Sequence, residues 1–279
     1  MLGSFLIFLR EGIEGSMIVA IMCAYLTAAG RRHLFRAVFL GVGAALLASS
    51  LGAVGLYVAI KDSFIGSTAQ TWFETGTFVL AVIVLTYMTF WMKRNARHLS
   101  ATLKSHVTAA VSGGSAVALA MLAFVTVGRE AVETVIFLLA ISFQNSALQM
   151  LAGALAGLAI SLAISVAVYR LGIRLNLRRF FTVVGAALMV VAAGLLANAV
   201  QNLQELRVLP GAGYGLWNTG GIVPEDSTLG DILHGLVGYA AAPTALQVLV
   251  WALFLGFGLL FFLGNPLAGK QSRAVVPES

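Results

Sequence analysis

The chain has 279 residues, of which 59% are hydrophobic and only 10% are charged. Soluble proteins devote about 25% of their residues to Asp, Glu, Lys and Arg, so this composition excludes a soluble globular domain and an intrinsically disordered chain. The single cysteine, Cys23, excludes a secreted fold held together by disulfides. The class that remains is an integral membrane protein built from helices.

Seven apolar stretches are long enough to cross a bilayer, which takes about 20 residues per helix. Arg10 and Glu11 interrupt the first stretch, so we predict a retained span there and not a cleaved signal peptide. The sequence therefore predicts an all-α, polytopic membrane protein of seven transmembrane helices. The predicted spans are Ser4–Thr27, Ala37–Ile60, Thr71–Met92, Ser115–Phe143, Leu148–Tyr169, Phe180–Leu203 and Thr244–Leu263.

The basic residues predict how these spans are oriented. Seventeen Lys and Arg against eleven Asp and Glu give a formal net charge of +6. Cytoplasmic connections are enriched in Lys and Arg, so we predict an outer N-terminus, an inner C-terminus and a cytoplasmic tail at 266–279. No basic patch is interleaved with aromatic residues, so we expect no nucleic-acid partner. The residues of the predicted inner side are Arg31, Arg32, Arg36, Lys93, Arg94, Arg97, Lys104, Arg170, Arg174, Arg178, Arg179, Lys270 and Arg273.

The longest connection, about 204–243, lies on the predicted outer side. It is rich in glycine and carries Glu205, Glu225, Asp226 and Asp231 against a single Arg207. A lid, a docking surface or an anionic funnel that concentrates cations would fit such a segment, and so would an ordinary solvated loop.

Two clusters of charge lie inside predicted spans, where each ionisable residue costs about 3 kcal/mol. The first span reads Arg10-Glu11-Gly12-Ile13-Glu14 and the fourth reads Arg129-Glu130-Ala131-Val132-Glu133. At about 100° per residue, the three charged side chains of each R-E-x-x-E motif point to one face of the helix. Two such faces in contact would form a carboxylate-rich site suited to hard cations such as the iron ions.

Buried ion pairs that only lock the two helices together are the structural alternative. Such pairs stabilise poorly because desolvation offsets their attraction, and two arginines need only two glutamates. The two surplus carboxylates favour a metal site. Glu74, near the outer end of the third span, either reaches water or assists cation entry.

The spans also suggest an internal repeat, with copies at about 1–106 and 107–210. The R-E-x-x-E helix opens each copy, a small-residue helix follows (Gly41–Ala45 and Gly153–Gly157), and an aromatic pair starts the third (Trp72-Phe73 and Phe180-Phe181). Three spans per copy require the copies to be inverted, as in many secondary transporters. The helix at about 244–263 stands outside the repeat, and we expect residues 1–265 to form a single transmembrane domain.

With these motifs, the chain resembles the oxidase-dependent iron transporter family along nearly its whole length. The similarity extends to Phe73-Glu74, to Leu85–Met92, to Gly172–Leu177 and to Gly238–Pro243. The second motif has Ala131 where the family usually has glycine, and Leu206-Arg207 follows Glu205 where relatives often have Ala-Gly.

The resemblance implies import of ferrous or ferric iron across the bacterial cytoplasmic (inner) membrane. Iron is then the transported substrate, and we expect neither a cofactor nor enzymatic activity. Family members work with extracytoplasmic iron-oxidising or iron-delivering proteins, and the outer connection is the expected docking site. Carried over by position, the metal ligands are Glu11, Glu14, Glu130 and Glu133, with Arg10 and Arg129 as charge partners, and Glu74 and Glu205 as further acids.

Three other functions compete with this hypothesis. The transported ion could be another divalent metal, such as manganese or lead. An intramembrane enzyme could use the carboxylates as acid and base, although the sequence offers no nucleophile with a base partner. A scaffold role would make the charges purely structural.

Overall fold

The computed structural model describes residues 2–64, 68–95, 107–108, 115–142, 147–171, 177–211, 213–225 and 227–264. Long helices dominate them, and no β-strand occurs within these ranges, so the prediction of an all-helical protein is confirmed. The elements are α1 (Leu2–Ala28), the short 3-10 helix η1 (Arg32–Leu34), α2 (Phe35–Phe64), α3 (Thr68–Asn95), α5 (Ala116–Ser142), α6 (Ala147–Leu171), α7 (Leu177–Glu205), α8 (Thr228–Val237) and α9 (Ala245–Leu263).

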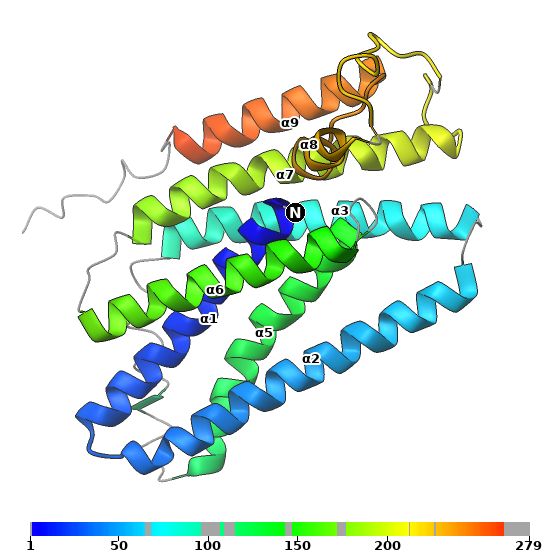
Figure 1. The fold of residues 1–279 in the computed structure, drawn as a ribbon. Helices are drawn as coiled ribbons and strands as arrows, with labels where there is room; N and C mark the ends of the chain where they lie inside the picture. Colours follow the sequence, from blue (N-terminus) through cyan, green and yellow to red (C-terminus); the bar gives the residue numbers. More distant parts are fainter. Residues whose placement is uncertain are drawn as a thin grey trace, which may run out of the picture.

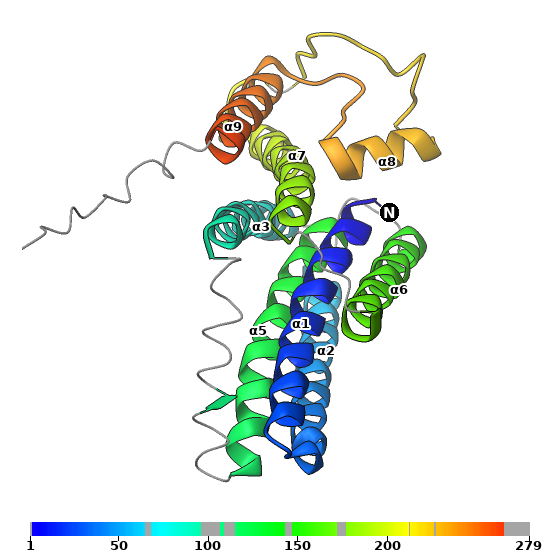
Figure 2. The ribbon, with the colours of Figure 1, turned by 90° about the vertical axis from the view of Figure 1, so that its left-hand side faces the viewer.

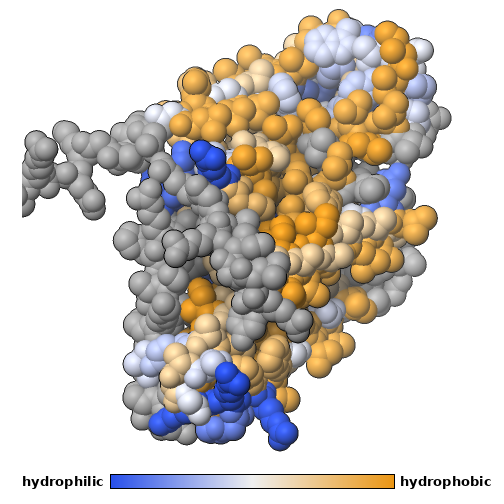
Figure 3. Space-filling model, turned by 60° about the vertical axis from the view of Figure 1, so that its left-hand side comes forward, coloured by the Kyte–Doolittle hydropathy of each residue, from blue (hydrophilic) through white to orange (hydrophobic). Residues whose placement is uncertain are grey.

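Every predicted span coincides with one of these helices. Within the described residues, five stretches are long and apolar enough to cross a membrane: Arg32–Gly55, Thr68–Arg94, Ala147–Ala167, Arg179–Glu205 and Ala245–Leu263. Helices α1 and α5 are of similar length, but each carries a charged motif near its middle. Hydrophobic residues cover most of the described surface in Figure 3, and strongly hydrophilic residues gather in smaller patches near its edges.

Helices from the two halves of the chain pack against each other. Helix α1 packs on α6, α2 on α5, and α3 on α7, while α1 and α5 also meet directly (Figures 1 and 2). Helix α9 packs on the outside of α7. The motif helices α1 and α5 therefore contact each other and the helices on either side of them.

Two hydrophobic clusters hold this arrangement. One joins α1, α3, α5 and α7 through residues such as Phe78, Leu85, Phe137 and Leu188. The other joins α1, α2 and α5 through residues such as Met22, Leu26, Val38 and Leu119. Burial of these side chains contributes about 1.5–3 kcal/mol each, although a bilayer offers the same apolar surroundings and so reduces that contribution.

The segment between α7 and α9 contains helix α8, which packs against α7 and α1. Helix α8 lies crosswise beside α7 (Figure 2). The Ser227 side chain caps its start by accepting a hydrogen bond from the Gly230 amide, and Gly238, with φ 72°, follows its last residue as the C-terminal cap. Gly238 touches the backbone of Gly194, about three turns before α7 ends. The indole Nε1 of Trp251 on α9 donates to the Val237 carbonyl at 2.8 Å. This segment therefore folds back along the bundle.

Several predictions fall on residues outside the described ranges. They concern the tail at 266–279, the segment Gly172–Asn176, Asp226, and the basic residues Arg97, Lys104, Arg174, Lys270 and Arg273. Membrane crossing by all seven helices, the inverted repeat and the orientation of the termini stay predictions.

Candidate metal centre

The first motif lies on the buried side of α1. Arg10, Glu11 and Glu14 are 2%, 6% and 3% exposed. One helical turn separates Arg10 from Glu14, and the Arg10 Nε donates to Glu14 Oε1 at 3.0 Å. The same guanidinium approaches Glu11 through Nη1, 3.4 Å from Oε1. Arg10 therefore partly neutralises both glutamates of its own motif.

The second motif, on α5, repeats the pairing but not the burial. Arg129 Nε donates to Glu133 Oε1 at 3.0 Å, yet the Arg129 side chain is 46% exposed. Its guanidinium lies 5.2 Å from the ring centroid of Trp91, and Nη2 donates to Met88 Sδ at 3.1 Å. Helix α3 thus holds the second arginine at the edge of the cluster, whereas the first is enclosed.

Carboxylates from both motifs converge. One oxygen each from Glu11, Glu14 and Glu130 lies within 4.8 Å of the other two. Small divalent ions such as Zn²⁺ and Mg²⁺ bind oxygen at about 2.0–2.2 Å, so ligand oxygens across one such ion are about 4–4.5 Å apart. The three oxygens are therefore close enough for a single cation to bridge them after small side-chain movements.

Several buried polar atoms of this cluster form no hydrogen bond within the part of the chain that the structure describes. They are both oxygens of Glu11, the Oε2 atoms of Glu130 and Glu133, and the Nη1 and Nη2 atoms of Arg10. Arg10 Nη1 and Glu11 Oε1 form only their longer ion pair of 3.4 Å. A buried polar group without a hydrogen bond costs about 1–3 kcal/mol, and more when it is charged. Such a cost is typical of a site whose groups serve a ligand and not the fold.

Glu74 and Glu205 lie outside this triad of carboxylates. Glu74 accepts a hydrogen bond from Gln70 along α3 at 2.8 Å, and Glu205 accepts one from Gln201 at the end of α7 at 3.1 Å. One oxygen of each carboxylate is therefore bonded to a side chain of its own helix. A part for either residue in cation entry stays a prediction.

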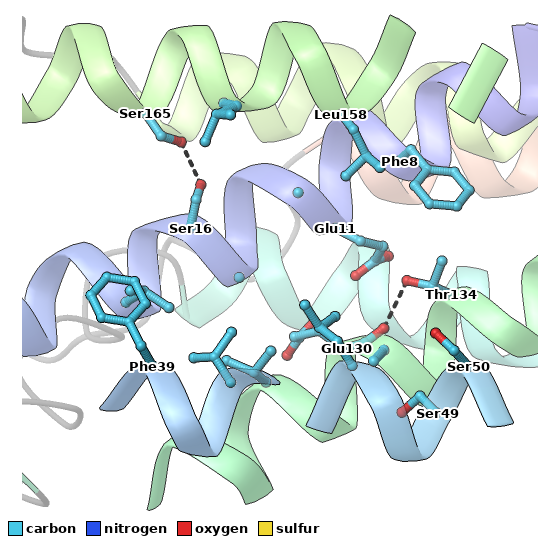
Figure 4. Close-up of a pocket in the computed structure, with 18 of the residues that line it drawn as sticks. Phe8, Glu11, Ser16, Phe39, Ser49, Ser50, Glu130, Thr134, Leu158 and Ser165 are labelled. Carbon is cyan, nitrogen blue, oxygen red and sulfur yellow. Dashed lines mark hydrogen bonds between the residues drawn. The ribbon is translucent and has the colours of Figure 1, made fainter. Parts of the chain in front are cut away.

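The charged cluster also borders a cavity of about 800 Å³ between α1, α2, α5 and α6. Figure 4 shows Glu11 and Glu130 lying near each other in this cavity, with Phe8 beside Glu11. Thr134 donates to the main-chain oxygen of Glu130 at 2.9 Å, and Ser16 on α1 forms a hydrogen bond with Ser165 on α6. Two of the four motif glutamates therefore face the cavity.

Sequence reasoning did not identify the residues that hold Arg129 or those that form the cavity. Met88 and Trp91 lie in the span-three run that supports the family resemblance, but that run has no spacing that assigns them to Arg129. The serines and phenylalanines of the cavity are ordinary residues for a transmembrane helix. Only the packing of four helices reveals them.

Comparisons with known proteins agree with the motifs. The model of the iron permease FTR1 family matches residues 1–275. The chain is 34% identical to "Ferrous iron permease EfeU" of Escherichia coli O6:H1, over 96% of this chain and 97% of the relative, and equally to that of Shigella sonnei. The Yersinia pestis protein of the same name is 32% identical over 94% and 93%. No solved structure matches significantly. The resemblance noted from the motifs is thus confirmed, and the chain belongs to the iron permease FTR1 family.

Proposed function

We propose that the chain imports iron, as Fe²⁺, across the bacterial cytoplasmic membrane, and that Glu11, Glu14, Glu130 and Glu133 bind the ion in transit. The observation that carries the proposal is the convergence of the Glu11, Glu14 and Glu130 oxygens within 4.8 Å. Oxygen ligands of this kind suit hard and borderline divalent cations. An ion would also satisfy the buried carboxylate oxygens that have no hydrogen-bond partner.

Charge supports a divalent ion. The cluster contains four carboxylates and two guanidinium groups, which gives a formal charge of −2 when all are ionised. A charge buried in apolar surroundings is costly unless it is compensated, and one Fe²⁺ would compensate this one. Relatives that are 32–34% identical carry the name ferrous iron permease, which points to the same oxidation state.

The packing supports seven spans in two inverted repeats. If the chain contains two copies of one unit, α1, α2 and α3 of the first copy correspond to α5, α6 and α7 of the second. Exchanging corresponding helices turns the contact between α1 and α6 into the contact between α5 and α2. The same exchange leaves the α1–α5 and α3–α7 pairs unchanged, and all of these pairs are in contact. A two-fold axis in the membrane plane would produce this pattern and would place the motifs together near the midplane. Seven spans place the two termini on opposite sides of the membrane, and the basic residues of the predicted inner connections favour an outer N-terminus and an inner C-terminus.

The folded segment between α7 and α9 is our candidate surface for an extracytoplasmic iron-oxidising or iron-delivering protein. In its first part, Tyr214 and Ile222 are each 83% exposed. Large apolar side chains at the end of a membrane bundle suit contact with a protein partner or the lipid headgroups. Glu205 at the end of α7 adds negative charge nearby.

The test is uptake of radioactive Fe²⁺ into vesicles that contain the purified protein under anoxic conditions. Glu11→Gln and Glu130→Gln keep the shape of each side chain but remove its charge, and we expect each to lower uptake about tenfold or more. Glu225→Gln is the matched control, because Glu225 is an exposed acid that accepts a hydrogen bond from the Ala241 amide at 2.6 Å, which an amide oxygen can also accept.

Normal uptake by both motif variants would contradict the assignment of the site. Competition by Mn²⁺ and Pb²⁺ in the same assay distinguishes an iron permease from a transporter of another divalent metal. Loss of folded protein in both motif variants, measured by size-exclusion chromatography, would instead favour the scaffold role.

A further inference from the structure

The cavity beside the carboxylates is a groove in the membrane-facing side of the bundle. All the residues that line it lie on α1, α2, α5 and α6. Its borders include Phe39 and Leu46 on α2 and Leu162 and Val166 on α6, which are 45–62% exposed. Both helices contain stretches apolar enough to cross a membrane, so in a bilayer the groove meets lipid between them.

Most of the groove is apolar. Aliphatic side chains and the three rings of Phe8, Phe35 and Phe39 form its walls. Ser16 and Ser165 bond to each other, which leaves their hydroxyl groups less available to a passing ion. A hydrated metal ion would lose its water here with little in exchange, so the groove is poorly suited to be an aqueous path.

The charged residues on the groove wall are Glu11 and Glu130. Glu11 is 6% exposed; its Oε1 lies 3.4 Å from Arg10 Nη1, and neither carboxylate oxygen accepts a hydrogen bond of normal geometry within the described residues. Figure 4 shows both carboxylates turned toward the cavity, with the Phe8 ring beside Glu11. Acidic groups at the base of an aromatic and aliphatic groove complement a positive charge on an apolar body.

We propose that this groove binds a lipophilic organic cation that enters from the bilayer and places its charged centre between Glu11 and Glu130. The volume of about 800 Å³ is in the range of sites for drug-sized ligands. Such a ligand occupies two of the carboxylates assigned to the metal, so it blocks iron uptake. This consequence for uptake rests on the proposed function, whereas binding itself does not.

The experiment measures binding of radioactive tetraphenylphosphonium to the protein in phosphatidylcholine vesicles, with protein-free vesicles as the background. The protein-free vesicles measure simple partition into lipid, and tetraphenylborate, an anion of the same shape, tests whether protein-dependent binding requires a positive charge. We expect protein-dependent binding of the cation only. The double variant Glu11→Gln/Glu130→Gln should bind the cation at least about thirtyfold more weakly, as expected when a buried charge loses its partner.

A second variant tests the groove and keeps the carboxylates. Gly15 lines the groove, and a Cβ at this position meets no atom within 4 Å, so Gly15→Leu fills space without a collision at the backbone. Gly43 on α2 is equally open but does not line the groove, so Gly43→Leu is the matched control. We expect Gly15→Leu to weaken cation binding and Gly43→Leu to leave it unchanged.

Equal binding of the two tetraphenyl ions, or unchanged cation binding by the double glutamate variant, would overturn the proposal and leave the groove as lipid-filled space. Vesicles that bind the cation normally but import no iron would instead contradict the proposed transport function and not the groove. The two hypotheses therefore fail in different assays.

Discussion

Arg10 and Arg129 occupy the same position in the two motifs but not the same environment. The Arg10 side chain is 3% exposed, whereas that of Arg129 is 46% exposed. Arg10 interacts electrostatically with Glu14, Glu11 and, across the helix interface, Glu133. Arg129 is turned toward Trp91 and Met88 on α3. The cluster thus has one central and one peripheral cation, although its sequence is repeated.

The two arginines should therefore differ in their contribution to stability. Arg10→Gln leaves Glu11 and Glu14 buried without their counter-charge, and breaking a buried pair in this way costs about 3–5 kcal/mol. Arg129→Gln removes a half-exposed guanidinium whose partner Glu133 is 11% exposed, and an exposed charge contributes less to an ion pair, so we expect a smaller loss than for Arg10→Gln. Thermal unfolding of the two variants in detergent, without added metal, measures the difference. Equal destabilisation would show that the asymmetry in exposure has no energetic consequence.

Glu74 and Glu205 should act on the rate of uptake and not on metal affinity. Both lie outside the triad and are hydrogen-bonded within their own helices, so Glu74→Gln and Glu205→Gln leave the binding site intact. We expect the dissociation constant for Fe²⁺, measured by anoxic equilibrium dialysis, to change by no more than about twofold.

Uptake at low iron concentration should nevertheless fall in these variants if the two acids attract cations toward the site. That effect should shrink at high ionic strength, because salt screens exposed charges. Glu14→Gln serves as the comparison, since it removes a triad ligand and should weaken binding itself. A large loss of affinity in Glu74→Gln would place Glu74 among the ligands.

The sequence was sufficient to predict the helices and the charged motifs, because both follow from local patterns. Apolar runs of about 20 residues indicate spans, and the R-E-x-x-E spacing places three charges on one helix face. The position of Arg129 depends on α3, the groove on four separate helices, and the path of α8 on the contact between Gly194 and Gly238. These features arise from contacts between distant segments, which periodicity does not encode.

Close packing of α1 on α6 should depend on Gly157. A Cβ at this position would lie 2.6 Å from the Phe5 carbonyl oxygen and 2.9 Å from the Leu9 amide nitrogen, so a side chain would separate the two backbones. Small residues allow such approaches in membrane helices. Gly157→Leu should lower the unfolding temperature in detergent and reduce iron uptake, because α1 carries Glu11 and Glu14.

Gly43→Leu again provides the control, since it adds the same side chain at an open position. We expect it to unfold at the temperature of the unmodified protein and to transport iron normally. Equal stability of the Gly157 and Gly43 variants would show that α1 and α6 can move apart without loss.

The orientation of the chain can be tested with single cysteines. The chain has one cysteine, Cys23, so Cys23→Ser provides a background without thiols. Tyr214, between α7 and α9, is 83% exposed, and Arg32, between α1 and α2, is exposed as well. One predicted span precedes Arg32 and six precede Tyr214. If the N-terminus lies outside, Arg32 is therefore on the inner side and Tyr214 on the outer side. A membrane-impermeant maleimide should therefore label Tyr214→Cys in cells with an intact inner membrane, and Arg32→Cys only after permeabilisation. The reverse pattern would invert the topology and would place the segment between α7 and α9 in the cytoplasm, where no extracytoplasmic protein could reach it.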